Sequence, residues 1–158
     1  MKNYFTTILL SMLVSGAITS VEGQSLTDAQ KAQIEKEIDS AFTLSVKAAE
    51  TLDYDKIALG VDDRHQAGFI TNGRYFADFN SLLQTAKDNA TPGLRQQISF
   101  QQKKITVLSN SIALLTATGE SKLNTSTGTV YISFFWTFVY EKIKGDWKVI
   151  QSHQSGNR

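Results

Sequence analysis

The sequence predicts an α+β fold, in which helices come first and antiparallel strands follow. Two observations lead to this prediction. Apolar residues recur at spacings of three and four in the first half, which is typical of helices. From Leu94 onward, long segments of strand-forming residues alternate with short turns. A chain of 158 residues with 41% hydrophobic residues has room for one hydrophobic core, so we expect a single domain.

Residues 1–23 have the features of a signal peptide: a positive start, a short apolar stretch and small residues before the cleavage point. The apolar stretch is shorter than the ~20 residues that a membrane-spanning helix needs. Cleavage after Gly23 would leave a single domain over residues 24–158, cleavage after Ala17 is an alternative, and a buried N-terminal helix is the competing interpretation. The chain has no cysteine for lipid attachment, so we expect a periplasmic or secreted protein without a stable membrane anchor.

A long helix is expected to begin after Thr27 and to run to about Asp53. Thr27 and Gln30 have the spacing of a capping box, which satisfies backbone N–H groups at a helix start. The stripe that would face the core consists of Ile34, Ile38, Ala41, Ser45, Ala48 and Leu52.

The middle of the chain predicts two shorter helices and a hairpin between them. A short helix is expected over residues 54–60, and the Asn72-Gly73 pair predicts a tight turn between two strands. A third helix is expected over residues 79–89, with Asp78 as its N-cap and Thr91-Pro92-Gly93 after its end.

Four strands are expected to complete the chain. Their connections are short, so neighbouring strands should pair antiparallel. The expected strands are Gln96–Leu108, Ile112–Leu123, Thr129–Ile143 and Trp147–Ser155.

The last hairpin decides which side chains face the helices. A two-residue turn at Lys144-Gly145 or Gly145-Asp146 would place even residues of one strand opposite odd residues of the other. The inward face is then expected to carry Val130, Ile132, Phe134, Trp136, Phe138, Tyr140, Trp147, Val149, Gln151, His153 and Ser155. The outward face would carry Tyr131, Ser133, Phe135, Thr137, Val139, Glu141, Lys148, Ile150, Ser152 and Gln154. Tyr131, Phe135, Val139 and Ile150 form too large an apolar surface to face water, which predicts a homodimer through this face.

Several segments resemble the SnoaL-like branch of the nuclear transport factor 2-like superfamily. They are Ile105–Ala113, Trp136–Lys142, Gly145–Ile150 and His153-Gln154-Ser155, with Asp63, Phe69 and the Asn72-Gly73 turn earlier in the chain. The resemblance implies a cystatin-like, cone-shaped curved sheet wrapped around a long helix, an internal pocket and a homodimer. Its relatives include isomerases, dehydratases, polyketide cyclases, epoxide hydrolases and proteins without known chemistry, so the fold does not assign an activity. Close relatives often carry a histidine where this chain has Gln151.

Composition and motifs exclude several function classes. A net charge of +1 provides no general attraction to nucleic acid. The absence of cysteine excludes thiolate metal sites and a cysteine nucleophile. His65 and His153 with a nearby aspartate would be a minimal metal site, but no close spacing supports one, so we expect neither a metal nor a cofactor. No glycine-rich phosphate loop and no nucleophile elbow occur in the sequence.

Two hypotheses of function remain. The preferred one is a pocket protein that binds a small apolar or amphipathic ligand through Trp136, Phe138, Tyr140, Gln151, His153 and Ser155. The rival is a cofactor-free lyase, isomerase or hydrolase of the ketosteroid-isomerase or polyketide-cyclase type. It would use His153 with Asp63, or another early-loop aspartate, to move a proton. A carboxylate that faces inward within reach of His153 would distinguish the rival from the preferred hypothesis.

Overall fold

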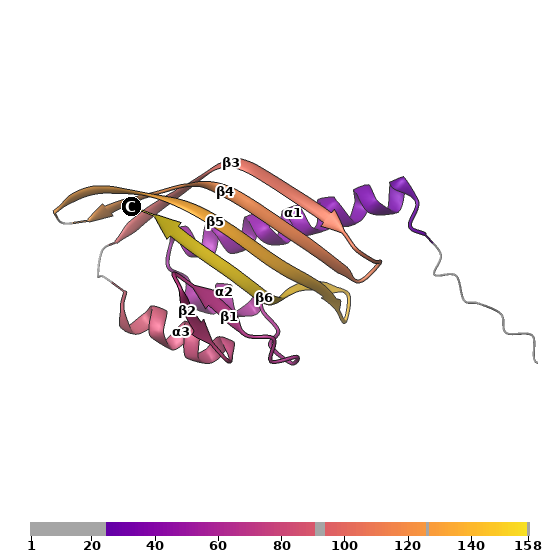
Figure 1. Cartoon of the computed structure of the whole chain (residues 1–158), viewed down its shortest axis with the longest axis horizontal. Coiled ribbons are helices and arrows are strands. Elements are labelled where there is room, and N and C mark those ends of the chain that lie inside the picture. Colours follow the sequence, from indigo (N-terminus) through magenta and orange to yellow (C-terminus); the bar gives the residue numbers. More distant parts are fainter. Residues whose placement is uncertain (1–24, 91–93, 126, 158) are drawn as a thin grey trace, which may run out of the picture.

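The computed structural model describes residues 25–90, 94–125 and 127–157, which form three helices and one six-stranded sheet (Figure 1). The helices are α1 (Asp28–Glu50), α2 (Tyr54–Leu59) and α3 (Phe79–Asp88). The strands are β1 (Phe69–Thr71), β2 (Arg74–Phe76), β3 (Arg95–Val107), β4 (Ile112–Thr125), β5 (Gly128–Ile143) and β6 (Asp146–Asn157). The predicted signal peptide and Thr91-Pro92-Gly93 lie outside the described residues. Within those residues, no helix combines the length and apolar character needed to cross a membrane.

Helix α1 begins at the predicted capping box. The Thr27 hydroxyl accepts the Gln30 backbone N–H at 3.3 Å, and the Gln30 side chain accepts the Thr27 N–H at 2.9 Å. The helix ends at Glu50 rather than Asp53, because Asp53 caps α2 by accepting the Lys56 N–H at 3.1 Å. Its buried residues are Ile34, Ile38, Phe42 and Ala48.

The sheet has the order β2-β1-β6-β5-β4-β3. The antiparallel meander from β3 to β6 is confirmed, and so is the hairpin at Asn72-Gly73, where both residues have positive φ angles of 48° and 77°. The hairpin joins the meander because β1 pairs in parallel with β6, with Phe69 opposite Ser152. This parallel contact between distant segments was not predicted.

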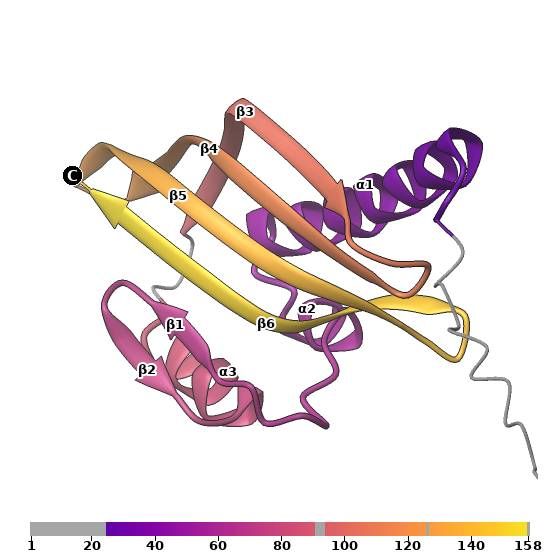
Figure 2. The same cartoon turned by 45° about the vertical axis from the view of Figure 1, so that its right-hand side comes forward.

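The long strands curve over α1, and the β1–β2 hairpin extends the sheet beyond β6, with α3 beside it (Figures 1 and 2). At one bend, Gln101 is an extra residue of β3 between the pairs Phe100–Gly119 and Gln102–Thr118. Gly119 has no side chain here because a Cβ would collide with the Ser99 carbonyl. The predicted fold class, an α+β curved sheet around a long helix with two shorter ones, is therefore confirmed.

The last hairpin has the predicted turn but a different pairing farther on. The turn is Lys144-Gly145, and it places Lys142 opposite Trp147 and Tyr140 opposite Val149, as expected. The next pair is Val139 with Gln151, so Ile150 is the extra residue of a β-bulge.

The bulge reverses which side of the sheet the end of β6 presents. Trp136 is paired with Gln154 and Phe138 with Ser152, whereas Thr137 is paired with His153. The prediction that Gln151, His153 and Ser155 face inward with Trp136 is therefore wrong, and so is the outward placement of Ser152 and Gln154. One additional residue in a strand of period two moves every later side chain to the opposite face.

Candidate functional site

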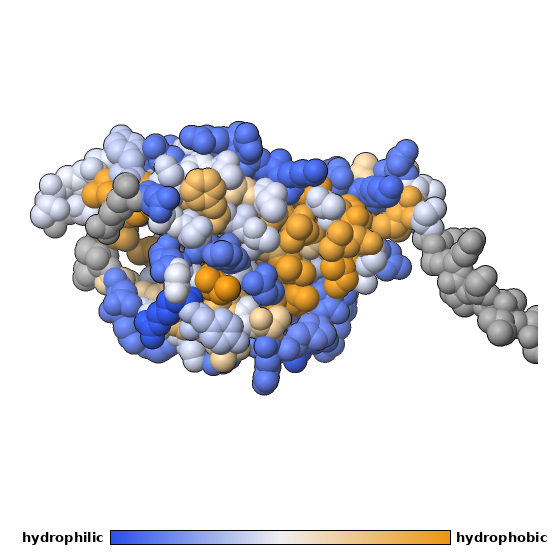
Figure 3. Space-filling model, viewed as in Figure 1, coloured by the Kyte–Doolittle hydropathy of each residue, from blue (hydrophilic) through white to orange (hydrophobic). Residues whose placement is uncertain are grey.

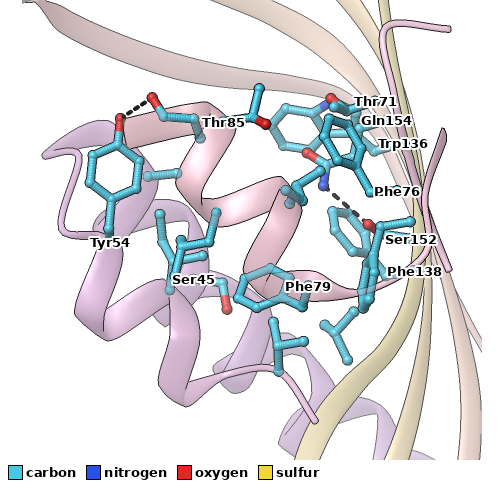
Figure 4. A pocket seen from close by; sticks show the side chains of 18 of the residues that line it. Ser45, Tyr54, Thr71, Phe76, Phe79, Thr85, Trp136, Phe138, Ser152 and Gln154 are labelled. Atoms are coloured by element: carbon cyan, nitrogen blue, oxygen red, sulfur yellow. Dashed lines mark hydrogen bonds between the residues drawn. The ribbon is translucent and has the colours of Figure 1, made fainter. Parts of the chain in front are cut away.

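A cavity of about 410 Å³ lies between the sheet and the three helices (Figure 4). This volume is in the range of small-molecule sites. Residues from α1, α2, α3, β1, β2, β5 and β6 contribute to the lining. They are Phe42, Ser45, Val46, Ala49, Tyr54, Ile57, Val61, Phe69, Thr71, Asn72, Phe76, Phe79, Leu82, Leu83, Thr85, Ala86, Asn89, Trp136, Phe138, Tyr140, Val149, Ser152 and Gln154.

The described lining contains no acidic, basic or histidine side chain. Most of it is aliphatic or aromatic, and its polar side-chain groups are hydroxyls, carboxamides and the indole N–H of Trp136. Such a lining favours an uncharged ligand, since an ion placed there would lose its hydration without gaining an opposite charge. It also lacks the usual groups that take up or release a proton near neutral pH.

The predicted ligand-binding residues separate into two sets. Trp136, Phe138 and Tyr140 line the cavity as predicted. Gln151, His153 and Ser155 do not, because the bulge at Ile150 directs them away from it. His153 is exposed on the outward side of the sheet.

Asp63 lies outside the cavity lining and has a local structural contact. Its carboxylate accepts the backbone N–H of Phe79 at 2.7 Å, at the first turn of α3. A carboxylate is favourable there because the first N–H groups of a helix have no partner within the helix. The predicted catalytic pair, His153 and Asp63, is therefore not brought together at the cavity.

The other early-loop aspartates are also paired near the surface. Arg64 donates to Asp62 across 2.6 Å, and this hydrogen bond lowers the pKa of Asp62 to about 2. Asp78 accepts the Ser81 backbone N–H at 2.8 Å as the N-cap of α3, which lowers its pKa. Neither carboxylate lines the cavity.

The two histidines do not form a metal site. His65 Nε2 lies 2.6 Å from a carboxylate oxygen of Glu141, and His153 is paired with Thr137 on the outward side of the sheet. Over residues 25–90, 94–125 and 127–157, no group of three metal-ligating side chains occurs.

The Tyr140 hydroxyl is buried, and it has no hydrogen-bond partner among the described residues. The side chain is 1% exposed, and burial raises its pKa, because the charged phenolate would be poorly solvated. A buried hydroxyl without a partner destabilises the folded state.

Sequence reasoning missed two kinds of lining residue. Phe42 continues the spacing of four that begins with Ile34 and Ile38, so its helical periodicity could have identified it. Ser152, Gln154 and their neighbour Thr71 line the cavity only because β6 has a bulge and pairs with β1. No local sequence pattern predicts the bulge in β6 or its pairing with β1.

Comparisons with known proteins agree with this architecture. The model of the SnoaL-like domain family matches residues 38–157. No curated protein sequence matches the chain.

Solved structures with a similar fold include an NTF-2 like protein of unknown function from Shewanella oneidensis. It has 22% identity and a TM-score of 0.59, and the match covers 77% of this chain and 98% of that one. The CaMKII hub homology domain of Chlamydomonas reinhardtii has 14% identity and a TM-score of 0.67, with coverage of 79% and 99%. A protein with a cystatin-like fold from Caulobacter vibrioides has 12% identity and a TM-score of 0.62, with coverage of 78% and 89%. At these identities the likeness is one of fold.

Proposed function

This chain belongs to the SnoaL-like branch of the nuclear transport factor 2-like superfamily, and from that premise we propose that it binds a small, uncharged, largely apolar molecule in its internal cavity. The observation that supports the proposal is the lining: about 410 Å³ bounded by apolar side chains, hydroxyls, carboxamides and an indole N–H, without a charged group among the described residues. Burial of an apolar ligand there would be favoured by the hydrophobic effect.

The geometry does not favour the rival function, proton transfer by His153 and Asp63. An acid or base must come within hydrogen-bond reach of the atom that it protonates or deprotonates. Neither residue lines the cavity, and Asp63 already accepts the Phe79 N–H. Binding without turnover is therefore the function that the geometry favours.

Two serines of α1 allow a matched test of ligand binding. Ser45 lines the cavity and donates to the Ala41 carbonyl at 3.2 Å, while the exposed Ser40 donates to the Lys36 carbonyl at 2.9 Å. Ser45→Phe would fill part of the cavity, and Ser40→Phe would place the same ring in solvent. The probe is N-phenyl-1-naphthylamine, an uncharged dye whose fluorescence rises in apolar surroundings.

We expect the unaltered protein and Ser40→Phe to bind the dye with equal affinity and Ser45→Phe to bind it at least about 10-fold more weakly, because the filled volume excludes the ligand. Circular dichroism would check that both variants are folded. Absence of dye binding by the unaltered protein, or equal binding by a folded Ser45→Phe, would overturn the proposed function. Native mass spectrometry of the purified protein tests the same function through a ligand that co-purifies.

We also propose that two copies associate through the outward face of the sheet. Tyr131 and Phe135 are each 53% exposed on this face, four residues apart on β5. Val139 pairs with Leu114 on the same side, and Ile150 is half-buried nearby. Apolar residues gather on the sheet face that is turned toward the viewer in Figure 3, with α1 behind it. A second copy would remove this apolar surface from water.

Export is the third proposal. The short apolar stretch within residues 1–23, with small residues at its end, supports cleavage near Gln24 and a periplasmic or secreted location.

A further inference from the structure

The wall of the cavity that the sheet provides consists of three aromatic residues of β5 and their partners on β6. Trp136 is paired with Gln154, Phe138 with Ser152 and Tyr140 with Val149. Successive pairs are two β5 residues apart, which corresponds to about 7 Å along a strand. The partner on β6 changes from a carboxamide to a hydroxyl and then to an aliphatic side chain, so the β6 side of the wall becomes apolar toward Val149. At that end the wall still carries the buried Tyr140 hydroxyl, but the unused donors are more numerous at the Trp136–Gln154 end.

The polar end presents hydrogen-bond donors for which the described residues provide no acceptor. Gln154 Nε2 donates to Ser152 Oγ at 3.3 Å, which leaves the Ser152 hydroxyl hydrogen and the second Nε2 hydrogen of Gln154 unused. Among the described residues, the Trp136 indole N–H has no acceptor either. Trp136, Gln154 and Thr71 lie together at one end of the cavity in Figure 4, and Ser152 joins them through the dashed hydrogen bond. Ser152 is 3% exposed, so its remaining hydroxyl hydrogen is held away from bulk water.

The opposite end has mainly apolar surfaces. Val149 lines it from β6, and Ile57 and Val61 line the cavity from α2 and the segment that follows. Val61 is also bridged to Val149, which fixes these two residues beside one another. A ligand of mixed character would therefore gain most free energy in one of its two orientations.

We propose that the Trp136–Gln154 end holds an uncharged carbonyl oxygen of the ligand, and that the ligand's apolar body extends past Phe138 toward Val149. This inference rests on the proposed binding function and specifies its ligand class. Neutral donors stabilise a carbonyl oxygen, whereas a carboxylate of the same shape would lose far more hydration on entry than these donors return. Gln154 is then the residue that determines specificity.

Three naphthalenes of matched shape test the ligand class: 2-acetylnaphthalene, 2-naphthoate and 2-isopropylnaphthalene, each measured by displacement of the dye. The variant is Gln154→Leu, which removes the carboxamide and keeps a side chain of similar size. Its control is Gln151→Leu on the same strand, since Gln151 is half-buried as well but does not line the cavity.

We expect the unaltered protein to bind the ketone at least about 10-fold more tightly than the carboxylate, because the carboxylate gives up more hydration. The ratio of ketone affinity to hydrocarbon affinity should fall about 3- to 10-fold in Gln154→Leu, the size of one lost hydrogen bond, and stay unchanged in Gln151→Leu. The hydrocarbon is more hydrophobic than the ketone, but this difference is the same for every variant. It therefore cancels when the ratios of the variants are compared.

Equal ratios in the two variants, or tighter binding of the carboxylate by the unaltered protein, would overturn this inference. Dye binding without displacement by the ketone would overturn it as well. Equal ratios and failed displacement leave the proposed function intact, whereas tighter binding of the carboxylate would also contradict a ligand that is uncharged. If neither the dye nor any naphthalene binds, the proposed function fails and the inference with it. Should Gln154→Leu not fold, Gln154→Met takes its place, since it also removes the carboxamide and keeps a side chain of similar size.

Discussion

The indole N–H of Trp147 donates to the Glu37 carboxylate across 2.8 Å, which connects the start of β6 to the middle of α1. Lys142 donates to the same carboxylate oxygen at 2.8 Å, and Gln33 donates to the other oxygen at 3.0 Å. Hydrogen bonding by Lys142, followed by that of Gln33 and Trp147, lowers the Glu37 pKa from 4.5 to about 2. This cluster holds the long helix against the last hairpin.

We expect Glu37→Gln to lower the free energy of unfolding at neutral pH by about 1–2 kcal/mol, because a charge-assisted hydrogen-bond cluster is weakened. The lowered pKa means that the unfolded chain binds a proton more readily than the folded one. The stabilisation is therefore complete above pH 4.5 and is lost as the pH falls toward about 2.

Urea unfolding at a series of pH values measures this effect, with Glu35→Gln as the control because Glu35 is exposed on the same helix. The Glu37→Gln variant should lose less stability between pH 4.5 and 2 than the unaltered protein does. If the stability of Glu37→Gln and that of the unaltered protein fell equally with decreasing pH, the cluster would contribute nothing to the free energy of unfolding.

Tyr140→Phe is expected to leave the protein as stable as before or to stabilise it by up to about 1 kcal/mol. The substitution removes a buried hydroxyl that has no partner among the described residues, and so removes the cost of its desolvation. Thermal and urea unfolding provide the measurement, with the exposed Tyr131→Phe as the control. Destabilisation well beyond that of the control would mean that the hydroxyl does have a hydrogen-bond partner in solution.

His153→Ala is expected to change the free energy of unfolding by less than about 0.5 kcal/mol and to leave dye affinity unchanged. His153 is exposed and lies outside the cavity lining. Urea unfolding and a dye titration of this one variant test both statements. A loss of affinity would place the imidazole in the cavity, and so would contradict the bulge at Ile150.

Phe135→Lys is expected to convert dimers to monomers, because a charge buried in an apolar interface is costly. Light scattering at several protein concentrations measures the mass. Ser133→Lys on the same strand serves as a comparison, because it introduces the same charge but removes less apolar surface than Phe135→Lys does. A monomeric unaltered protein at every concentration would contradict the proposed dimer.

We expect the exported protein to begin near Gln24, as measured by N-terminal sequencing. The prediction rests on the pattern of residues 1–23. Recovery of exported material that retains Met1 would contradict it.

The sequence by itself determined the secondary structure and the turns, because these depend on residues that are close along the chain. The Thr27–Gln30 capping box, the Asn72-Gly73 turn and the Lys144-Gly145 turn each act over at most four residues. The residues that resembled the SnoaL-like family were also sufficient to anticipate the curved sheet around a long helix. Trp136, Phe138 and Tyr140 were identified correctly because they lie on β5, whose alternation is regular.

Only the tertiary structure decided which residues of β6 face the cavity. On one edge, β6 bridges Val61 at Val149 and then pairs with β1 from Ser152 onward, and Ile150 is the extra residue between these two contacts. No glycine or proline marks the bulge, so the local sequence is compatible with an unbroken strand. The register depends on partners 88 and 83 residues away along the chain, at Val61 and Phe69. Because side chains alternate with a period of two, that single extra residue exchanged His153 for Gln154 in the cavity wall.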